Sequence, residues 1–282
     1  MIPAGAMMVH RGSMQRALLC SALCVCIGLA PAAQGQELPV ECGPPGGLTR
    51  TGVVDHVTDG DTVRLEDGTR VRLIGLDAPE IHWSRDEAEP YAREARRALQ
   101  EILDDHDDRV VLHPDDEDRD PHGRTLAHLF TPDGTPIAAL LLERGLATAL
   151  TIPPNDRHLE CYRATEARAQ ASREGLWSLP RHQVFQAEEL PRDAKGFRLV
   201  EGEVTRIGES RRAHWINLDG GAAALRIDKA DMGYFPRLDP EGLEGKRVQG
   251  RGYVYTHRGQ PRMRIRHPAD LEILEDTGDA AR

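Results

Sequence analysis

The sequence has 282 residues, a formal net charge of −10 and 39% hydrophobic residues. The length allows two modest domains, and the acidic balance argues against a protein built throughout to attract a polyanion. Beyond the N-terminal region no apolar run is long enough to cross a bilayer, which excludes a protein with several membrane-spanning helices.

The first segment, residues 1–36, has the pattern of a secretory signal peptide. Two arginines precede an almost wholly apolar run over residues 17–30, and small and polar residues follow it. The run is short for a membrane span, so the alternative of an uncleaved anchor is less favoured. Either Met1 or Met14 could be the start. We therefore expect export to the periplasm or the extracellular space, no membrane association after cleavage, and a short N-terminal extension over residues 37–50.

Two of the five cysteines, Cys42 and Cys161, remain after removal of the signal. In an exported protein a cysteine pair more often forms a disulfide than a metal site. The alternative is two unpaired thiols. We expect a Cys42–Cys161 disulfide that ties the N-terminal extension to a late helix.

Residues 51–178 alternate short strands with helices. Valines and leucines between residues 53 and 76 mark strands separated by Asp-Gly turns at Asp59 and Asp67. Two further strands are expected over Val110–Leu112 and Thr125–Phe130. Apolar spacing and glycine stops predict three helices, over Tyr91–Leu103, Ile137–Arg144 and Leu159–Arg173. Five strands with three helices fit a small barrel with helical attachments, a β-rich α+β fold.

A second small all-β barrel is expected after a linker. Residues 179–195 contain prolines and mixed charge without periodicity, as linkers do. Residues 196–275 are purely strand-like, and residues 276–282 form a tail. Five strands are expected, over Leu199–Ile207, Trp215–Leu218, Ala223–Ile227, Arg247–Tyr255 and Arg262–His267.

The net charge is divided unevenly along the chain. Residues 37–194 hold 18 Lys and Arg against 32 Asp and Glu, a balance of −14, whereas residues 195–275 hold 15 against 12, a balance of +3. The acidic groups are most simply solvated loops and helix faces. Because they slow long-range capture of a polyanion by the first domain, we expect the second domain to offset them.

Five side chains of the first domain form a pattern with chemical meaning. Asp61 ends a tight turn and Asp77 ends a strand, so their carboxylates could converge, and oxygen ligands favour Ca²⁺ or Mg²⁺ over zinc. Glu80 follows a proline and is the candidate general base for a water. Arg72 and Arg124 can each donate paired hydrogen bonds to phosphate oxygens. The set predicts a metal-dependent phosphodiesterase.

Each part of this set has a plainer explanation when taken alone. Asp-Gly-Asp is usually only a turn, Asp-Ala-Pro-Glu is a common loop, and a lone arginine in a strand generally lies at a solvated edge. The occurrence of all the parts in this order is what favours a catalytic role.

Residues 51–178 resemble the thermonuclease family, the staphylococcal nuclease homologues. The matching motifs are Thr-Asp-Gly-Asp-Thr-Val at 58–63, Val-Arg-Leu-Ile-Gly-Leu-Asp-Ala-Pro-Glu at 71–80, Gly-Arg at 123–124, Leu-Glu-Arg-Gly-Leu-Ala at 142–147 and Arg-Glu-Gly-Leu-Trp at 173–177. The resemblance implies an OB-type five-stranded barrel with three helices. It also implies calcium, in preference to magnesium, as the metal. The implied roles are calcium binding by Asp61, Asp77 and the backbone carbonyl of Ala78, general-base catalysis by Glu80, and phosphate binding by Arg72 and Arg124.

Two departures from the family pattern concern the substrate. Where relatives often have an aromatic residue before the glycine-arginine pair, this chain has His122, a candidate donor to a terminal phosphate. Leu-Thr-Ile-Pro at 150–153 replaces aromatic residues that stack on a base. The base preference and the substrate affinity therefore stay open.

The second domain offers a candidate surface for nucleic acid. Two predicted strands carry cations and aromatic rings at alternate positions, as single-strand binders do. The candidate residues are Arg251, Tyr253, Tyr255, Arg262, Arg264 and Arg266. The alternative is an ordinary solvated sheet face. The segment is also weakly similar to OB-type nucleic-acid-binding domains, so we expect an OB-like barrel.

These patterns together predict an exported, monomeric, calcium-dependent nuclease that hydrolyses DNA, with RNA as a second candidate substrate. One alternative is a catalytically weak nucleic-acid-binding protein, against which the complete set of five side chains argues. Another is an oligosaccharide- or protein-binding envelope module, because OB-type barrels also serve that purpose.

Overall fold

The computed structural model describes residues 42–44, 46–47, 49–85 and 87–274. The predicted signal peptide and the predicted tail lie outside these residues. Contacts divide the chain into two units, residues 1–37 and 38–282, so all described residues belong to one unit. Among the described helices, none is both long and apolar enough to cross a membrane.

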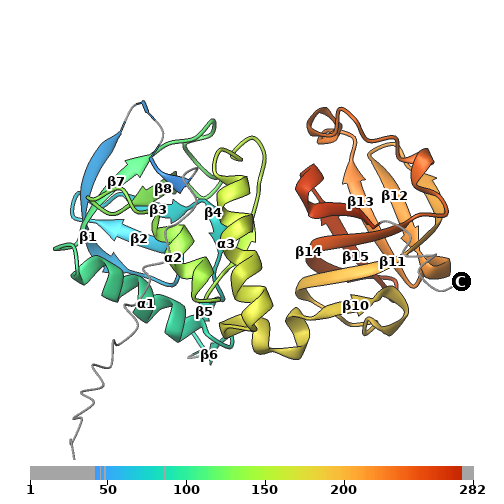
Figure 1. Ribbon diagram of the computed structural model, residues 1–282, viewed down its shortest axis with the longest axis horizontal. Coiled ribbons are helices and arrows are strands. Elements are labelled where there is room, and N and C mark those ends of the chain that lie inside the picture. Colours follow the sequence, from blue (N-terminus) through green and yellow to red (C-terminus); the bar gives the residue numbers. More distant parts are fainter. Residues whose placement is uncertain (1–41, 45, 48, 86, 275–282) are drawn as a thin grey trace, which may run out of the picture. The chain divides into compact units, whose positions relative to one another are not determined.

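The first barrel is closed by five strands in the order β1-β2-β3-β8-β7 (Figure 1). Their bounds are Arg50–Val57 (β1), Thr62–Leu65 (β2), Arg70–Leu73 (β3), Arg109–His113 (β7) and Thr125–Phe130 (β8). Strands β3 and β8 are parallel, and the other neighbours are antiparallel. Alternate residues such as Val63, Val71 and Leu73 are fully buried in the barrel. The predicted five-stranded barrel is confirmed.

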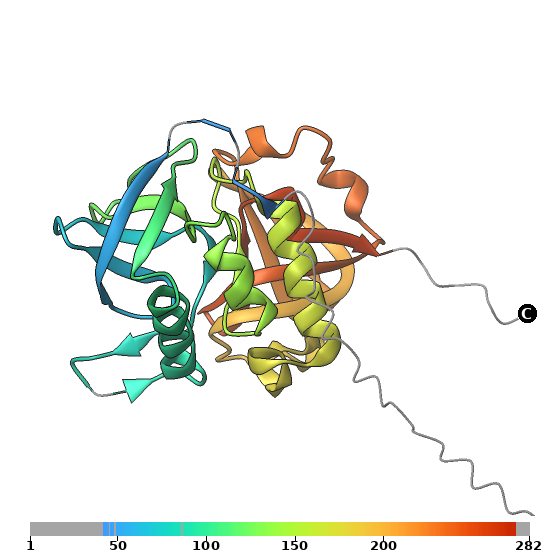
Figure 2. The ribbon, with the colours of Figure 1, turned by 60° about the vertical axis from the view of Figure 1, so that its left-hand side comes forward.

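Three helices accompany this barrel (Figures 1 and 2). They are α1 (Ala92–Asp104), α2 (Ile137–Glu143) and α3 (Leu159–Ser172), each within one residue of the predicted bounds. Helix α1 buries the face that carries Ala95, Leu99 and Ile102, which belongs to the barrel's hydrophobic core. Strand β4 (Gly75–Asp77) is the strand predicted to end at Asp77, but its partner β9 (Thr148–Leu150) was not predicted, and neither was the pair of β5 (Ile81–His82) with β6 (Glu87–Ala88).

The second barrel repeats the strand order of the first. Its strands are β11 (Gly196–Glu209), β12 (Ala213–Leu218), β13 (Ala223–Asp228), β14 (Arg247–His257) and β15 (Gln260–Ile265). They follow the order β11-β12-β13-β15-β14, the pairing of β11 with β14 closes the barrel, and β13 is parallel to β15. In both barrels the third and fifth strands form the parallel pair. The predicted second barrel of OB type is confirmed, and the repeat lies in the topology rather than in the sequence.

The segment predicted as a linker is partly regular. It contains the 3-10 turns η3 (Pro180–His182) and η4 (Ala187–Glu189) and the strand β10 (Val184–Gln186), which pairs in parallel with β11. Strand β16 (Leu271–Leu274) extends the same sheet beside β14. The other 3-10 turns are η2 (Gly175–Ser178), η5 (Asp219–Gly221), η6 (Met232–Tyr234), η7 (Glu241–Leu243) and η8 (Pro268–Asp270).

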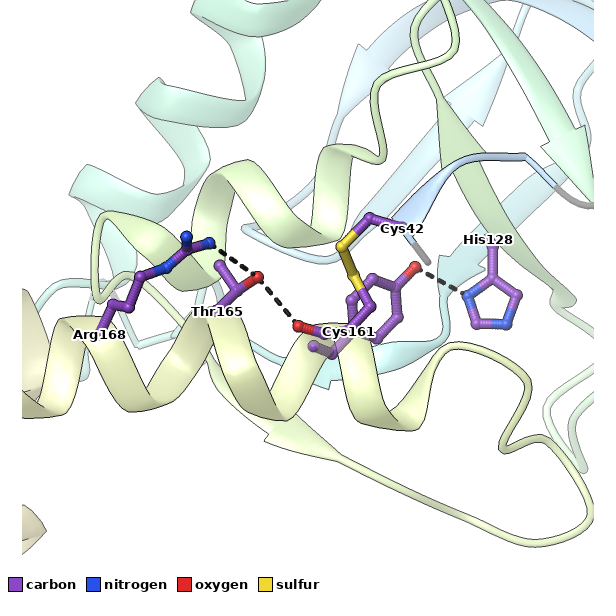
Figure 3. The surroundings of a disulfide bond; sticks show 6 residues. Cys42, His128, Cys161, Thr165 and Arg168 are labelled. Atoms are coloured by element: carbon purple, nitrogen blue, oxygen red, sulfur yellow. Dashed lines mark hydrogen bonds between the residues drawn. A yellow bond between two sulfur atoms is a disulfide. The ribbon is translucent and has the colours of Figure 1, made fainter. Parts of the chain in front are cut away.

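The predicted disulfide between Cys42 and Cys161 is confirmed (Figure 3). Both cysteines are buried, and their Cα atoms lie 5.3 Å apart. The bond joins the start of the described chain to the first turn of α3. Next to it the Tyr162 hydroxyl and Nδ1 of His128 are hydrogen-bonded at 3.0 Å.

His182 gives the fold a pH-dependent stability. Its ring stacks on Phe197 at 5.9 Å and meets Trp177 edge-on at 5.6 Å. Burial, with the neighbouring charges of Arg181 and Arg198, lowers the pKa of His182 to about 4. Between pH 6.5 and 4 the unfolded chain therefore takes up a proton that the folded chain does not.

Neutral His182 should increase the free energy of unfolding above pH 6.5. We expect this increase to be lost as the pH falls through 6.5 toward 4. The variant His182→Gln should lose less free energy of unfolding over this window than the wild type. Urea unfolding at pH 7.5 and 4.5 measures both, with the exposed His56→Gln as control. An equal loss in His182→Gln and wild type would contradict the assignment.

Candidate functional site

Asp61 and Asp77 are brought together by the turn before β2 and the end of β4. The Asp61 carboxylate is buried and accepts a hydrogen bond from the backbone N–H of Ala78 at 2.9 Å. The turn approaches Ala78 so closely that a Cβ at Gly60 would lie 2.6 Å from the Ala78 Cβ and 2.7 Å from the Ala95 Cβ. Glycine is therefore required in the Asp-Gly-Asp motif for the two aspartates to meet.

Arg72 of β3 bridges the two aspartates. Its Nη2 lies 2.6 Å from Oδ1 of Asp77 and 3.1 Å from Oδ2 of Asp61. Its Nη1 donates to the carbonyls of Leu73 at 2.5 Å and Leu76 at 3.0 Å. Burial alone would lower the pKa of Arg72, but the charges of Asp61 and Asp77 raise it. The guanidinium is therefore charged and held in a fixed orientation.

More carboxylates gather here than the sequence pattern predicted. Burial, followed by the charge of Asp61, raises the pKa of Asp59 to about 7. Burial also raises the pKa of Asp77 to about 6 against the opposing effect of Arg72. Asp59 was part of the recognised motif but had no assigned role. Burial is the main cause of both raised pKa values, and the charge of Asp61 adds to each of them.

Glu80 lies on the loop after β4 at the exposed side of the site. The loop is held to the segment before α1, because the Glu80 N–H donates to Oε2 of Glu89 at 3.3 Å and the Glu89 N–H donates to the Glu80 carbonyl at 3.0 Å. Burial and the charge of Asp61 raise the pKa of Glu80. A carboxylate with a raised pKa that water can reach suits a general base.

Arg124 is connected to the aspartates through Thr62. Its Nη1 donates to Oγ1 of Thr62 at 3.5 Å, and that hydroxyl donates to Oδ1 of Asp61 at 3.0 Å. Its Nε donates to Oδ2 of Asp120 at 2.6 Å, which fixes the side chain just before β8. The structure thus brings all five predicted side chains into one region.

Both arginines line one cavity of about 370 Å³. Asp77, Glu117 and Asp120 also line this cavity, and Leu150, Ile152 and Pro153 line it where the sequence lacks aromatic residues. Arg266 of the second barrel also lines this cavity. The cavity can therefore hold an anionic group beside an apolar one.

His122 is not among the residues that line the cavity. Its side chain is exposed, and its backbone carbonyl accepts a hydrogen bond from Arg70 at 3.1 Å. Its assignment to a terminal phosphate stays a prediction.

The donor atoms present suit a hard cation. No group of three or more His, Cys, Asp or Glu side chains in the described part of the chain has the arrangement of a metal site. The protein ligands would be the two aspartates and the Ala78 carbonyl, with water completing the coordination. Oxygen donors in this number fit Ca²⁺ or Mg²⁺, and the excess of carboxylate charge is what a cation would relieve.

The six predicted residues of the second barrel do not form one open surface. Arg251 forms an ion pair with the buried Glu166, and the Tyr253 hydroxyl donates to Asp77. Arg264 is 2.9 Å from carboxylate oxygens of Asp228 and Asp231. Strand β14 carries part of its cations and rings toward the first barrel, and the assignment of the six residues to nucleic-acid binding stays a prediction.

A smaller cation-aromatic surface remains on the second barrel. Tyr255 pairs with Arg262 across β14 and β15, and the Arg262 guanidinium lies 4.5 Å from the Trp215 ring centroid. Arg226 also lies over Trp215, at 5.6 Å. Trp215 and Arg226 were not among the predicted nucleic-acid-binding residues, although both lie in predicted strands.

The sequence is similar to those of known nucleases. The family model described as staphylococcal nuclease homologue matches residues 70–179. The chain is 35% identical over 128 residues to the thermonuclease of Staphylococcus intermedius, covering 44% of this chain and 74% of that protein. It is 31% identical over 128 residues to the thermonuclease of Staphylococcus hyicus, with the same coverage. Endonuclease YhcR of Bacillus subtilis is 28% identical over 138 residues, which cover 45% of this chain and 11% of that protein.

Proposed function

This chain belongs to the staphylococcal nuclease homologues, the thermonuclease family, and on that premise we propose that it is a calcium-dependent nuclease that hydrolyses DNA. Its enzyme class is that of a nuclease, a hydrolase of phosphodiester bonds. RNA is a second candidate substrate. The predicted signal pattern and the disulfide support export, and we propose a monomer.

One observation carries the proposal: Arg72 and Arg124 line the same cavity, while Arg72 also bridges Asp61 and Asp77. The cavity therefore has two fixed guanidinium groups, one of which also contacts the carboxylate pair. Guanidinium groups bind phosphate oxygens and stabilise the charge that develops on them in the transition state.

We assign the calcium ligands to Asp61, Asp77 and the Ala78 carbonyl. When bound, the cation supplies polarisation of a phosphoryl oxygen and orientation of the attacking water. Asp61 lies outside the matched residues 70–179. Its assignment rests on the hydrogen bond from Ala78 and on the contact with Arg72.

Glu80 takes the proton of the attacking water. Burial, followed by the charge of Asp61, raises the pKa of Glu80, so the carboxylate is a stronger base than an ordinary glutamate. Arg72 and Arg124 donate to the non-bridging oxygens as the water oxygen bonds to phosphorus and the ester P–O bond breaks, and the leaving sugar oxygen takes a proton from solvent. The apolar wall of the cavity contacts the sugar or base without stacking on it.

The second barrel contributes capture of the polyanion. Trp215, with Arg226 and Arg262 over its ring, offers an aromatic group and two cations for a nucleic acid. This surface also supports the second candidate function, a nucleic-acid-binding protein with weak catalysis, in which binding would persist without cleavage.

Cleavage assays on the purified protein separate these functions. We expect release of acid-soluble nucleotides from DNA in Ca²⁺, less in Mg²⁺, and none with excess chelator. Filter binding in chelator should still retain DNA, with an affinity that falls as salt rises. Retention of DNA without release of nucleotides in Ca²⁺ would favour the binding protein, and neither retention nor release would favour an envelope module.

A further inference from the structure

We propose that the second barrel completes the catalytic site of the first: Tyr253 positions the carboxylate of Asp77 through its hydroxyl, and Arg251 holds the strand that pairs with the one bearing Asp77. The proposal deepens the nuclease function and rests on it. Nothing in the family resemblance extends to this barrel, because the matched residues end at 179.

Tyr253 and Arg72 together fix both oxygens of Asp77. The Tyr253 hydroxyl donates to Oδ2, and Arg72 Nη2 donates to Oδ1 at 2.6 Å. Two donors on opposite oxygens set the rotation of the carboxylate, while each oxygen keeps a lone pair for a cation. Donors of this kind orient metal-binding carboxylates.

The tyrosine itself is directed toward the site by its neighbours. Its ring meets the ring of Phe197 edge-on, with centroids 6.2 Å apart. Both rings line a cavity of about 140 Å³ together with Asp77 and Ala78. Asp77 therefore borders the arginine-lined cavity and also this smaller one between the barrels.

Arg251, two residues earlier on β14, fixes the backbone behind Asp77. Its Nη1 and Nη2 donate to the two carboxylate oxygens of Glu166 at 2.6 and 3.0 Å, and Nη2 also donates to the Ala149 carbonyl at 2.8 Å. The Ala149 N–H donates to the same Glu166 carboxylate at 2.7 Å.

Ala149 lies in β9, which pairs with β4 so that Ala149 is opposite Leu76 and Thr148 is opposite Asp77. One strand of the second barrel therefore contacts the Asp77 side chain through Tyr253 and the partner strand of Asp77 through Arg251. Residues 176 and 102 positions apart in the sequence meet in these two contacts. Such a contact between a remote barrel and a candidate metal ligand makes Tyr253 a positioning residue.

The variant Tyr253→Phe tests the proposal, because it removes the hydroxyl and keeps the ring. Tyr234→Phe is the matched control, an exposed tyrosine of the same barrel on η6. The affinity for calcium alone is measured by isothermal titration calorimetry. We expect Tyr253→Phe to bind Ca²⁺ about 10–100-fold more weakly than the wild type and Tyr234→Phe to bind it equally well.

Nuclease assays add a readout that a purely structural role would not move. In Tyr253→Phe we expect a higher calcium concentration for half-maximal rate, partial recovery at saturating calcium, and an unchanged KM for DNA. If Tyr253 instead stacks on substrate, the phenylalanine variant will match the wild type in calcium affinity, and the proposal is wrong. The unfolding midpoint of Tyr253→Phe is measured as well. If the variant binds calcium more weakly only because this midpoint has fallen, the proposal is also wrong.

The outcome separates this inference from the proposed function. Calcium binding and cleavage by the wild type with no change in Tyr253→Phe would leave the nuclease intact and refute the role of Tyr253. A wild type that neither binds calcium nor cleaves DNA would refute both.

Discussion

The Glu80→Gln variant should fold as the wild type does and lose about 10²–10⁴-fold in the rate of DNA cleavage, the usual contribution of a general base. Glutamine keeps the shape of the side chain and the backbone hydrogen bonds to Glu89, but it cannot accept the proton of the attacking water. Calcium affinity should change little, because Glu80 is not an assigned ligand. Initial rates at saturating calcium and DNA measure the effect.

The matched control is Glu94→Gln on the exposed side of α1. It removes the same charge from the same acidic domain away from the site, so its rate should equal that of the wild type. A rate in Glu80→Gln within tenfold of the wild type would show that another group, or none, removes the proton.

The Arg251→Ala variant should reduce the free energy of unfolding by about 3–5 kcal/mol, the typical effect of removing one partner from a buried ion pair. Glu166 is only 1% exposed, and Arg251 supplies two of its hydrogen bonds. Removing the guanidinium leaves the buried carboxylate with Arg163, whose Nη1 lies 3.7 Å away, and with the Ala149 N–H. Urea unfolding measures the change.

Arg258→Ala, in the exposed turn between β14 and β15, is the control and should change the free energy of unfolding by less than about 0.5 kcal/mol. In the double variant Arg251→Ala/Glu166→Gln the loss should be smaller than in Arg251→Ala alone, since the uncompensated charge is gone. A loss below 1 kcal/mol in Arg251→Ala would mean that water reaches Glu166 in the folded protein.

The elements that the sequence predicted are those with strong local signals. The spacing of Ala95, Leu99 and Ile102 marks α1, and Asp-Gly turns mark the strands of the first barrel. Strands β5, β6 and β9 were missed because strands of two or three residues carry no periodicity. Strand β10 was missed for the same reason, in a segment that reads as a linker.

The candidate site was predictable for a similar reason. Asp61, Asp77 and Glu80 lie within 20 residues of one another, in motifs that fix turns. Asp59 belongs to the Asp-Gly-Asp motif, but its sequence context predicted only a turn residue. The contacts of Tyr253, Arg251 and Arg266 join positions far apart in the sequence, and barrel closure alone decides which side of β14 faces the first barrel. A single strand's alternation cannot decide that.

The most direct test of the central claim measures calcium occupancy and DNA cleavage in the same samples of wild-type protein. Calcium is titrated by calorimetry, and the release of acid-soluble nucleotides is followed at each concentration. We predict that both rise together, and that excess chelator abolishes both. Undiminished release of nucleotides in excess chelator would contradict the account, because the aspartates would then hold no cation that the reaction needs.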